Sequence, residues 1–280
     1  MRFDDFDKQM RVYEQSLDQN ILPDMYMVAR LDGRGFTKFT KKAGFEKPFD
    51  ESFRNLMSDT VKYLMTESGF NFIYGFTESD EISLLFIPDD QTFGRKVRKL
   101  NTTLAGCASA YFTMKYREYL YDNSIVDLEL ARHKGYLYDD SIKNLYLSIC
   151  TFDCRIIPLP NKERVADCFL WRQEDANRNA LNGWCYWTLR KEGKSKREAT
   201  SILSGKGVTF KNELLLQKGI NYNDVSGWQK RGIGFVFEEV EKEGMNPITG
   251  EKTKTKRREL VEKELPIGEE YKQMILKMLN

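Results

Sequence analysis

The chain has 280 residues, of which 41% are hydrophobic and 31% charged, enough for one large domain or two small ones around a core. The 44 Lys and Arg residues against 42 Asp and Glu residues give a formal net charge of +2, which excludes binding to nucleic acid by bulk charge alone. No apolar run approaches the roughly 18 residues of a membrane span, and the acidic start, MRFDDFDKQM, lacks the apolar stretch of a signal peptide. We therefore expect a cytoplasmic protein with no membrane partner.

The first strong strand signal covers residues 25–32, MYMVARLD. Alternation puts Met25, Met27, Ala29 and Leu31 on one face of this strand and Tyr26, Val28, Arg30 and Asp32 on the other. Arg30 and Asp32 should therefore lie on the same face, and Gly33 and Gly35 should break the strand.

A helix is expected next, with Asp50 as its N-cap and Gly69 marking its end. Residues 70–88 then form two apolar runs around the polar tetrad 77–80, which predicts a hairpin. Residues 93–119 predict a long helix whose first turns carry Arg95, Lys96, Arg98 and Lys99. Its middle, residues 104–112, consists largely of small residues that permit close packing, within the chain or between subunits.

The second half continues with a strand over 145–160 and an aromatic-rich helix over 167–191. Strands and helices mix without strict alternation, which favours an α+β fold with helices over one face of a sheet. Residues 190–218 hold eight basic residues against three acidic ones, a local net charge of +5. The last part predicts a long two-stranded hairpin that turns at 246–250 and projects from the body.

The five cysteines form no Cys-x-x-Cys pair, and His133 is the single histidine of the chain. A disulfide scaffold or a zinc site is therefore not expected, and free thiols packed as small apolar side chains are the better interpretation. We expect His133 to be solvated rather than catalytic.

Three acidic residues stand where folding does not need them: Asp32 ends one apolar strand, and Asp80 with Glu81 begins another. A carboxylate near a core is costly unless it is paired or bound to a cation, so these residues indicate a divalent metal. Magnesium suits the site better than zinc because no Cys or His cluster accompanies the acids. Successive strand residues point to opposite faces, so Asp80 and Glu81 cannot both join Asp32 unless the hairpin bends. A role as ordinary turn and edge residues stays open.

The basic residues after the hairpin complete this pattern. Arg95 and Lys99 should share a helix face by their i,i+4 spacing, with Lys96 beside them at the helix start. Cations there, with free backbone amides, would make an anion site. Acids for metal and a basic helix start for phosphates indicate nucleotidyl or phosphoryl transfer. The alternative is a solvated helix face.

The strings RLDGRGF, YGFTESDEIS and FGRKVRKL, in this order, resemble the motifs of the tRNA-histidine guanylyltransferase family. The resemblance continues through TFDCR, LWRQED, KGVTFKNELL and INYND, and covers most of residues 1–240. It implies a polymerase palm-like (ferredoxin-like) antiparallel sheet flanked by helices. It also implies an enzyme that activates the tRNA 5′ end with a nucleoside triphosphate and then adds nucleotides there, in the 3′-to-5′ direction.

The resemblance also implies the site residues. Asp32, Asp80 and the Gly33 carbonyl would bind two Mg²⁺ ions, and Glu81 would be the adjacent catalytic acid. ATP and GTP would be substrates. The residues expected to contact the nucleotide are Arg30, Gly33, Arg34, Gly35, Phe36, Lys47, Ser79, Asp80, Arg95, Lys96 and Lys99.

One departure concerns the RNA. Where family members devoted to tRNA-histidine carry His-Ile-Asn-Asn after WRQ-x-D, this chain has Asn177, Arg178, Asn179 and Ala180. Strict specificity for tRNA-histidine is therefore not expected, and the chain is more similar to guanylyltransferase-like relatives that add template-matched nucleotides to truncated 5′ ends. The family implies a homotetramer, a dimer of dimers. The residues expected to contact tRNA are Asn177, Arg178, Asn179, Arg190, Lys191, Lys206, Lys211 and Asn212.

We divide the chain into a palm-like catalytic region (1–135), a region that completes the fold and contacts tRNA (136–235), and a projecting hairpin with a C-terminal helix (236–280). Two other functions stay open. A palm-type nucleotide cyclase would use similar acids but would leave the second half unexplained. A non-catalytic tRNA-binding protein would leave the acids without a purpose.

Overall fold

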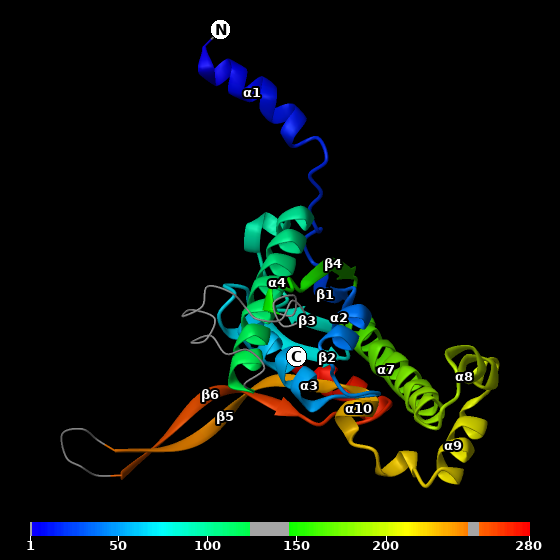
Figure 1. Cartoon of the computed structure of the whole chain (residues 1–280). Coiled ribbons are helices and arrows are strands. Elements are labelled where there is room, and N and C mark those ends of the chain that lie inside the picture. Colours follow the sequence, from blue (N-terminus) through cyan, green and yellow to red (C-terminus); the bar gives the residue numbers. More distant parts are fainter. Residues whose placement is uncertain (1, 124–145, 246–251) are drawn as a thin grey trace, which may run out of the picture.

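The computed structural model describes residues 2–123, 146–245 and 252–280. At its centre lies an antiparallel sheet with the strand order β4-β1-β3-β2-β5-β6 (Figure 1). The strands are β1 (Tyr26–Arg34), β2 (Phe72–Glu78), β3 (Glu81–Phe86), β4 (Thr151–Leu159), β5 (Ile233–Met245) and β6 (Lys252–Lys263).

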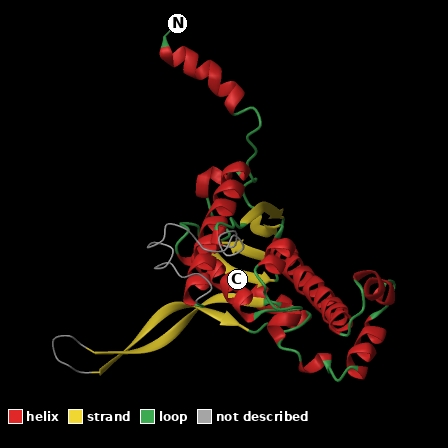
Figure 2. Cartoon of the chain, viewed as in Figure 1, coloured by secondary structure: helices red, strands yellow, loops and turns green. Residues whose placement is uncertain are grey.

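Helices surround the sheet (Figure 2). They are α1 (Phe3–Glu14), α2 (Phe36–Lys42), α3 (Glu51–Thr66), α4 (Val97–Asp122), α7 (Lys162–Lys191), α8 (Lys196–Leu203), α9 (Val208–Gln217), α10 (Gly227–Arg231) and α11 (Glu269–Met278). Short 3₁₀ turns are η1 (Thr92–Arg95) and η2 (Tyr222–Asp224). The predicted palm-like α+β fold, an antiparallel sheet flanked by helices, is confirmed.

Helices cover both faces of the sheet, so the expectation that they cover one face is wrong. The alternation along β1 is the reason, because both of its faces are apolar. Met27, Ala29 and Leu31 belong to the core cluster made with α2, α3 and α4. Val28 points the other way, into the cluster that includes Phe169 of α7 and residues of α11. Further along α7, a third cluster packs its C-terminal half against α8 and α9.

Several local predictions hold. The Asp50 side chain accepts a hydrogen bond from the Phe53 amide at 2.9 Å and so caps α3. The predicted hairpin is β2 and β3, joined by the two residues Ser79 and Asp80. The first strand, however, does not break at Gly33: β1 continues to Arg34, and Gly35, with φ 75°, is the N-cap position before α2.

The start of the long helix differs from the prediction. Phe93, Gly94 and Arg95 all have positive φ (56°, 58° and 59°), and α4 begins only at Val97. Arg95 is buried, with 4% of its surface exposed, and its guanidinium donates to the Met25 carbonyl. The expectation that Arg95 and Lys99 share a helix face is therefore wrong, because the backbone turns left-handed before the helix starts.

The terminal hairpin is confirmed. β5 pairs with β2 at its base and with β6 along its length, and the two strands project from the body (Figure 1). The predicted turn at 246–250 and His133 both lie outside the described residues. All five cysteines are free. Within the described residues, no helix has the length and apolarity needed to cross a membrane.

Candidate active site

The three predicted acids meet at one end of the sheet. Asp32 of β1 lies directly opposite Glu81 of β3, and the Gly33 amide donates to the Asp80 carbonyl at 3.0 Å. The turn that joins β2 to β3 is tight: Ser79 adopts φ 49°, a conformation that costs a non-glycine residue on the order of 1–3 kcal/mol. Such strain is typical of functional sites, and here it places Asp80 at the tip of the hairpin.

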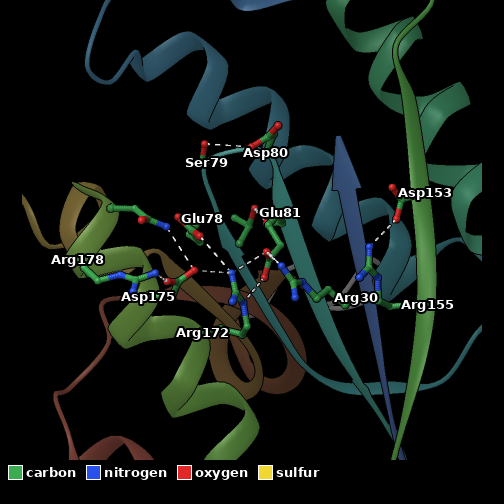
Figure 3. A network of polar contacts seen from close by, with 12 residues as sticks. Arg30, Glu78, Ser79, Asp80, Glu81, Asp153, Arg155, Arg172, Asp175 and Arg178 are labelled. Carbon is green, nitrogen blue, oxygen red and sulfur yellow. Dashed lines mark hydrogen bonds and ion pairs between the residues drawn. The ribbon is translucent and has the colours of Figure 1, made fainter. Parts of the chain in front are cut away.

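Glu81 is held by two arginines (Figure 3). Arg172 of α7 donates to both Glu81 oxygens, at 2.5 Å and 2.7 Å, and Arg30 donates to Glu81 Oε2 at 2.5 Å. Glu81 and Arg172 are only 6% and 4% exposed. Because both carboxylate oxygens are engaged, this arrangement favours a role for Glu81 in anchoring the turn over direct metal binding.

Glu78 and Asp175 complete the network around Arg172 (Figure 3). Their carboxylates lie 3.8 Å and 3.3 Å from the Arg172 guanidinium. Burial, and then the neighbouring Glu81, raise the pKa of Glu78 to about 8, so Glu78 holds a proton for much of the time at neutral pH.

Among the described residues, Asp32 and Asp80 lack a direct cationic partner of this kind, and Asp80 accepts a hydrogen bond from the Ser79 hydroxyl at 3.2 Å. In the part of the chain that the structure describes, neither carboxylate forms an ion pair with a lysine or arginine. Burial raises the pKa of Asp80, and the nearby Asp32 carboxylate raises it further. A cation between them would remove this repulsion.

The residues at this end fit Mg²⁺. No group of three or more His, Cys, Asp or Glu among the described residues could hold a metal by itself. Mg²⁺ does not require one, because it commonly takes one or two carboxylates and completes its shell with water and substrate phosphates. Two carboxylates without an ion-pair partner among the described residues, beside a nucleotide-sized cleft, match that pattern.

A cavity of about 820 Å³ opens beside Asp80, within the range of small-molecule sites. It brings together four residues predicted for nucleotide binding, Phe36, Lys47, Ser79 and Asp80. From the second half of the chain it adds Tyr186, Trp187, Arg190, Lys196 and Trp228. We call this cavity the nucleotide cleft.

Lys47 lies in the nucleotide cleft and donates to Thr40 Oγ1 at 2.8 Å. Burial lowers the pKa of Lys47, while Asp50 and Asp80 act in the opposite direction. A bound phosphate would favour the charged form of this lysine. Gly33 precedes the cleft residue Phe36 by three positions and is required by packing, because a Cβ there would come within 2.6 Å of the Phe36 ring.

Three predicted nucleotide contacts lie elsewhere. Arg95 contacts the Met25 carbonyl, just before β1 begins, and Lys96 Nζ lies 2.7 Å from Asp18. Asp32 is seven residues further along the strand, roughly 23 Å away. Lys99 lies in the first turn of α4, which begins directly after Lys96. Within one chain, the basic residues and the acids therefore occupy opposite ends of the sheet. The expectation that they form one site in the chain is wrong. Arg30 is also outside the cleft, held by Glu81 under α7, and Arg34 and Gly35 are exposed at the end of β1.

The residues predicted to contact tRNA lie on α7, on α9 and, for Lys206, between α8 and α9. Asn177 accepts from the Tyr222 hydroxyl at 3.2 Å, and Arg178 and Asn179 both bind Asp175. Lys206 lies over the Phe210 ring, and Asn212 is exposed on α9 near the half-buried Lys211. Arg190 differs, because it lines the nucleotide cleft, and Lys191 joins Lys47 in a groove beside it.

The cleft residues that sequence reasoning missed are Tyr186, Trp187, Lys196 and Trp228. Tyr186 and Trp187 belong to the aromatic-rich helix predicted over 167–191, and Trp228 lies within residues 1–240, the part of the sequence that the family resemblance covers. The three aromatic residues were not singled out, because an aromatic in a helix more often belongs to a core, and Lys196 was counted only among the basic residues of 190–218.

A palm-like sheet with two carboxylates that lack an ion-pair partner among the described residues, beside a nucleotide-sized cleft, is the arrangement of a nucleotidyltransferase. Two family models match: "tRNAHis guanylyltransferase" over residues 7–160 and "Thg1 C terminal domain" over residues 163–276. The chain belongs to the tRNA(His) guanylyltransferase family.

Individual proteins agree with this assignment. A probable tRNA(His) guanylyltransferase of Drosophila melanogaster is 30% identical over 88% of this chain and 75% of its own length, and the enzyme of Debaryomyces hansenii is 34% identical over 78% and 76%. The crystal structure of the Saccharomyces cerevisiae enzyme superposes with a TM-score of 0.66 at 27% identity, over 79% of this chain and 90% of that one. A bacterial guanylyltransferase-like protein in complex with ATP gives a TM-score of 0.64 at 27% identity, over 82% and 88%.

Proposed function

We propose that this chain is a 3′-to-5′ nucleotidyltransferase that activates a tRNA 5′ end with ATP or GTP and then adds guanylate and template-matched nucleotides. Its role would be tRNA(His) maturation or 5′-end tRNA repair. The observation that carries the proposal is the pair Asp32 and Asp80, which have no ion-pair partner among the described residues. Asp80 lines a cleft that also holds Lys47, and Asp32 lies opposite Glu81, the residue after Asp80. A cytoplasmic location stays a prediction.

Each residue has a distinct task in this proposal. Asp32, Asp80 and the Gly33 carbonyl would hold two Mg²⁺ ions, which when bound lower the pKa of the attacking hydroxyl and neutralise the leaving phosphates. Lys47, Ser79 and Arg190 would contact the triphosphate. Phe36 and Trp228 would exclude water from the cleft, which strengthens every electrostatic contact inside it.

We expect 5′-truncated tRNAs of several identities to be extended with the base that pairs with the opposite strand. The reason is the absence of the His-Ile-Asn-Asn string, which Asn177, Arg178, Asn179 and Ala180 replace. Labelled-nucleotide addition to a matched tRNA panel measures this. Activity confined to tRNA(His) would contradict the expected breadth and leave the reaction itself in place.

Lys47→Met should raise KM for the nucleoside triphosphate by about 10-fold to 100-fold, because a charge-assisted contact to phosphate is worth on the order of 1.5–3 kcal/mol. KM for tRNA should not change. Lys38→Met is the matched control, since Lys38 is an exposed lysine of α2 that does not line the cleft. Equal effects of the two substitutions on steady-state kinetics would contradict the assignment of Lys47.

Assembly as a homotetramer is part of the proposal. Phe3, Phe6, Met10 and Tyr13 form one exposed apolar face of α1, a helix that extends away from the body (Figure 1). A second apolar surface lies on α4, where Ala110, Met114 and Tyr121 line a groove. Exposed apolar faces of this kind support association between subunits. Sedimentation velocity should give a mass of four chains, and a monomer at micromolar concentration would contradict it.

A further inference from the structure

Trp171 is a large aromatic side chain left on the surface of α7, with 54% of it exposed. The next residue, Arg172, is buried. The Trp171 ring lies against the two arginines that hold Glu81: the guanidinium carbon of Arg30 is 5.8 Å and that of Arg172 is 4.8 Å from the ring centroid. The ring is therefore fixed next to the active-site turn while part of its surface faces solvent.

β4 places an exposed arginine on the same side of the sheet. Arg155 lies directly opposite Arg30 in the strand register, as Asp153 lies opposite Asp32. Residues directly opposite in an antiparallel pair project from the same face. The Arg155 and Asp153 side chains are 56% and 59% exposed and lie 3.3 Å apart, on the right of Figure 3. An exposed ion pair of this kind contributes on the order of 0–1 kcal/mol, so the fold does not require Arg155.

This surface, formed by Trp171 and Arg155, is distinct from the nucleotide cleft. Neither residue lines the cleft. Asp32 is two residues along β1 from Arg30, about 7 Å, and shares its face. Asp80 lines the cleft. The two acids therefore lie between the cleft on one side and the Trp171–Arg155 surface on the other.

The chemistry of the surface fits one nucleotide of a single strand. An aromatic ring stacks with a base, worth on the order of 1–3 kcal/mol, and an exposed guanidinium can bind phosphate through two parallel hydrogen bonds. We propose that Trp171 and Arg155 bind the 5′-terminal nucleotide of the acceptor RNA, with its base against Trp171 and its phosphate at Arg155. This inference rests on the proposed function, because it assigns the RNA end to one side of the acids and the nucleoside triphosphate to the other.

The first test measures the Kd of a 5′-truncated, 5′-monophosphorylated tRNA in the absence of nucleoside triphosphate. Trp171→Ala should raise Kd about tenfold, since 1.4 kcal/mol corresponds to a factor of ten, and Trp171→Phe should keep most of the affinity. The same tRNA with an abasic 5′-terminal nucleotide should bind the wild type as weakly as the normal tRNA binds Trp171→Ala. The alanine substitution should then have no further effect.

The second test concerns the phosphate. Arg155→Gln should reduce the slope of log K against log salt by about one. Arg164→Gln is the matched control, because Arg164 is also an exposed arginine in a surface ion pair, with Asp167 at 3.1 Å near the start of α7. This substitution should leave the slope unchanged. KM for ATP and GTP should not change in either variant.

Two outcomes overturn the inference. One is an unchanged tRNA Kd and salt slope in Trp171→Ala and Arg155→Gln, with thermal unfolding confirming that both variants fold. The other is an increase in KM for the nucleoside triphosphate instead, which would place the triphosphate on this surface. The proposed function is judged separately, by whether the wild type extends any tRNA, so the two failures are distinguishable.

Discussion

Asp32→Asn and Asp80→Asn should each slow nucleotide addition by a factor on the order of 10³, comparable to the loss of a key electrostatic group in other enzymes. Each substitution keeps the size of the side chain and removes one of the two carboxylates that have no ion-pair partner among the described residues. The free enzyme should not be destabilised, because burial and Asp32 disfavour the ionised form of Asp80. Single-turnover extension of a 5′-truncated tRNA measures the rate.

The matched control is Asp153→Asn. Asp153 lies on the same rung of the sheet, directly opposite Asp32, but its carboxylate is exposed and paired with Arg155. The addition rate should stay within about threefold of the wild type, because a surface pair contributes little. A loss as severe as that of Asp32→Asn would mean that the acids of this rung act together and that the assignment to Asp32 and Asp80 is incomplete.

Arg172→Met should lower the free energy of unfolding by about 3–5 kcal/mol, the usual cost of removing one partner of a buried ion pair. The substitution leaves Glu81 with Arg30 alone and leaves Asp175 and Glu78 without their shared cation. The double variant Arg172→Met/Glu81→Met should recover much of the loss, because apolar residues of similar size often replace such pairs without penalty. Urea denaturation measures both.

Arg178→Met provides the comparison on the same helix. Arg178 also pairs with Asp175, but its side chain is 74% exposed. Its substitution should change stability by no more than about 0.5 kcal/mol. Equal losses of unfolding free energy for Arg172→Met and Arg178→Met would contradict the view that burial makes the Arg172 network important for stability.

Local structure could be predicted from the sequence wherever neighbouring residues decide it. The alternation of β1 separates Met27 from Val28, Asp50 caps α3 with its own side chain, and the β2–β3 hairpin follows from two apolar runs around a polar turn. The motifs around Asp32 and Asp80 were sufficient to identify the family, because the order of several short strings is specific. These signals depend on contacts within a few residues.

The start of α4 shows where that reasoning fails. The composition of residues 93–99 predicts a helix, but Arg95 turns left-handed and buries its guanidinium against the Met25 carbonyl. A contact 70 residues away in sequence outweighs helix propensity, which is worth under about 1 kcal/mol per residue.

The sequence by itself determined the family, the antiparallel palm-like sheet and the meeting of Asp32 with Asp80 at one strand end. Only the tertiary structure decided three further points: that Glu81 is held by Arg30 and Arg172, that Lys96 and Lys99 lie at the far end of the sheet, and that α7 and α10 close the nucleotide cleft. The physical reason is common to all three. Strand direction and register fix which residues share an end of the sheet. The packing of α7 brings Arg172 to Glu81, 91 residues away in sequence, and so fixes which charges are neutralised.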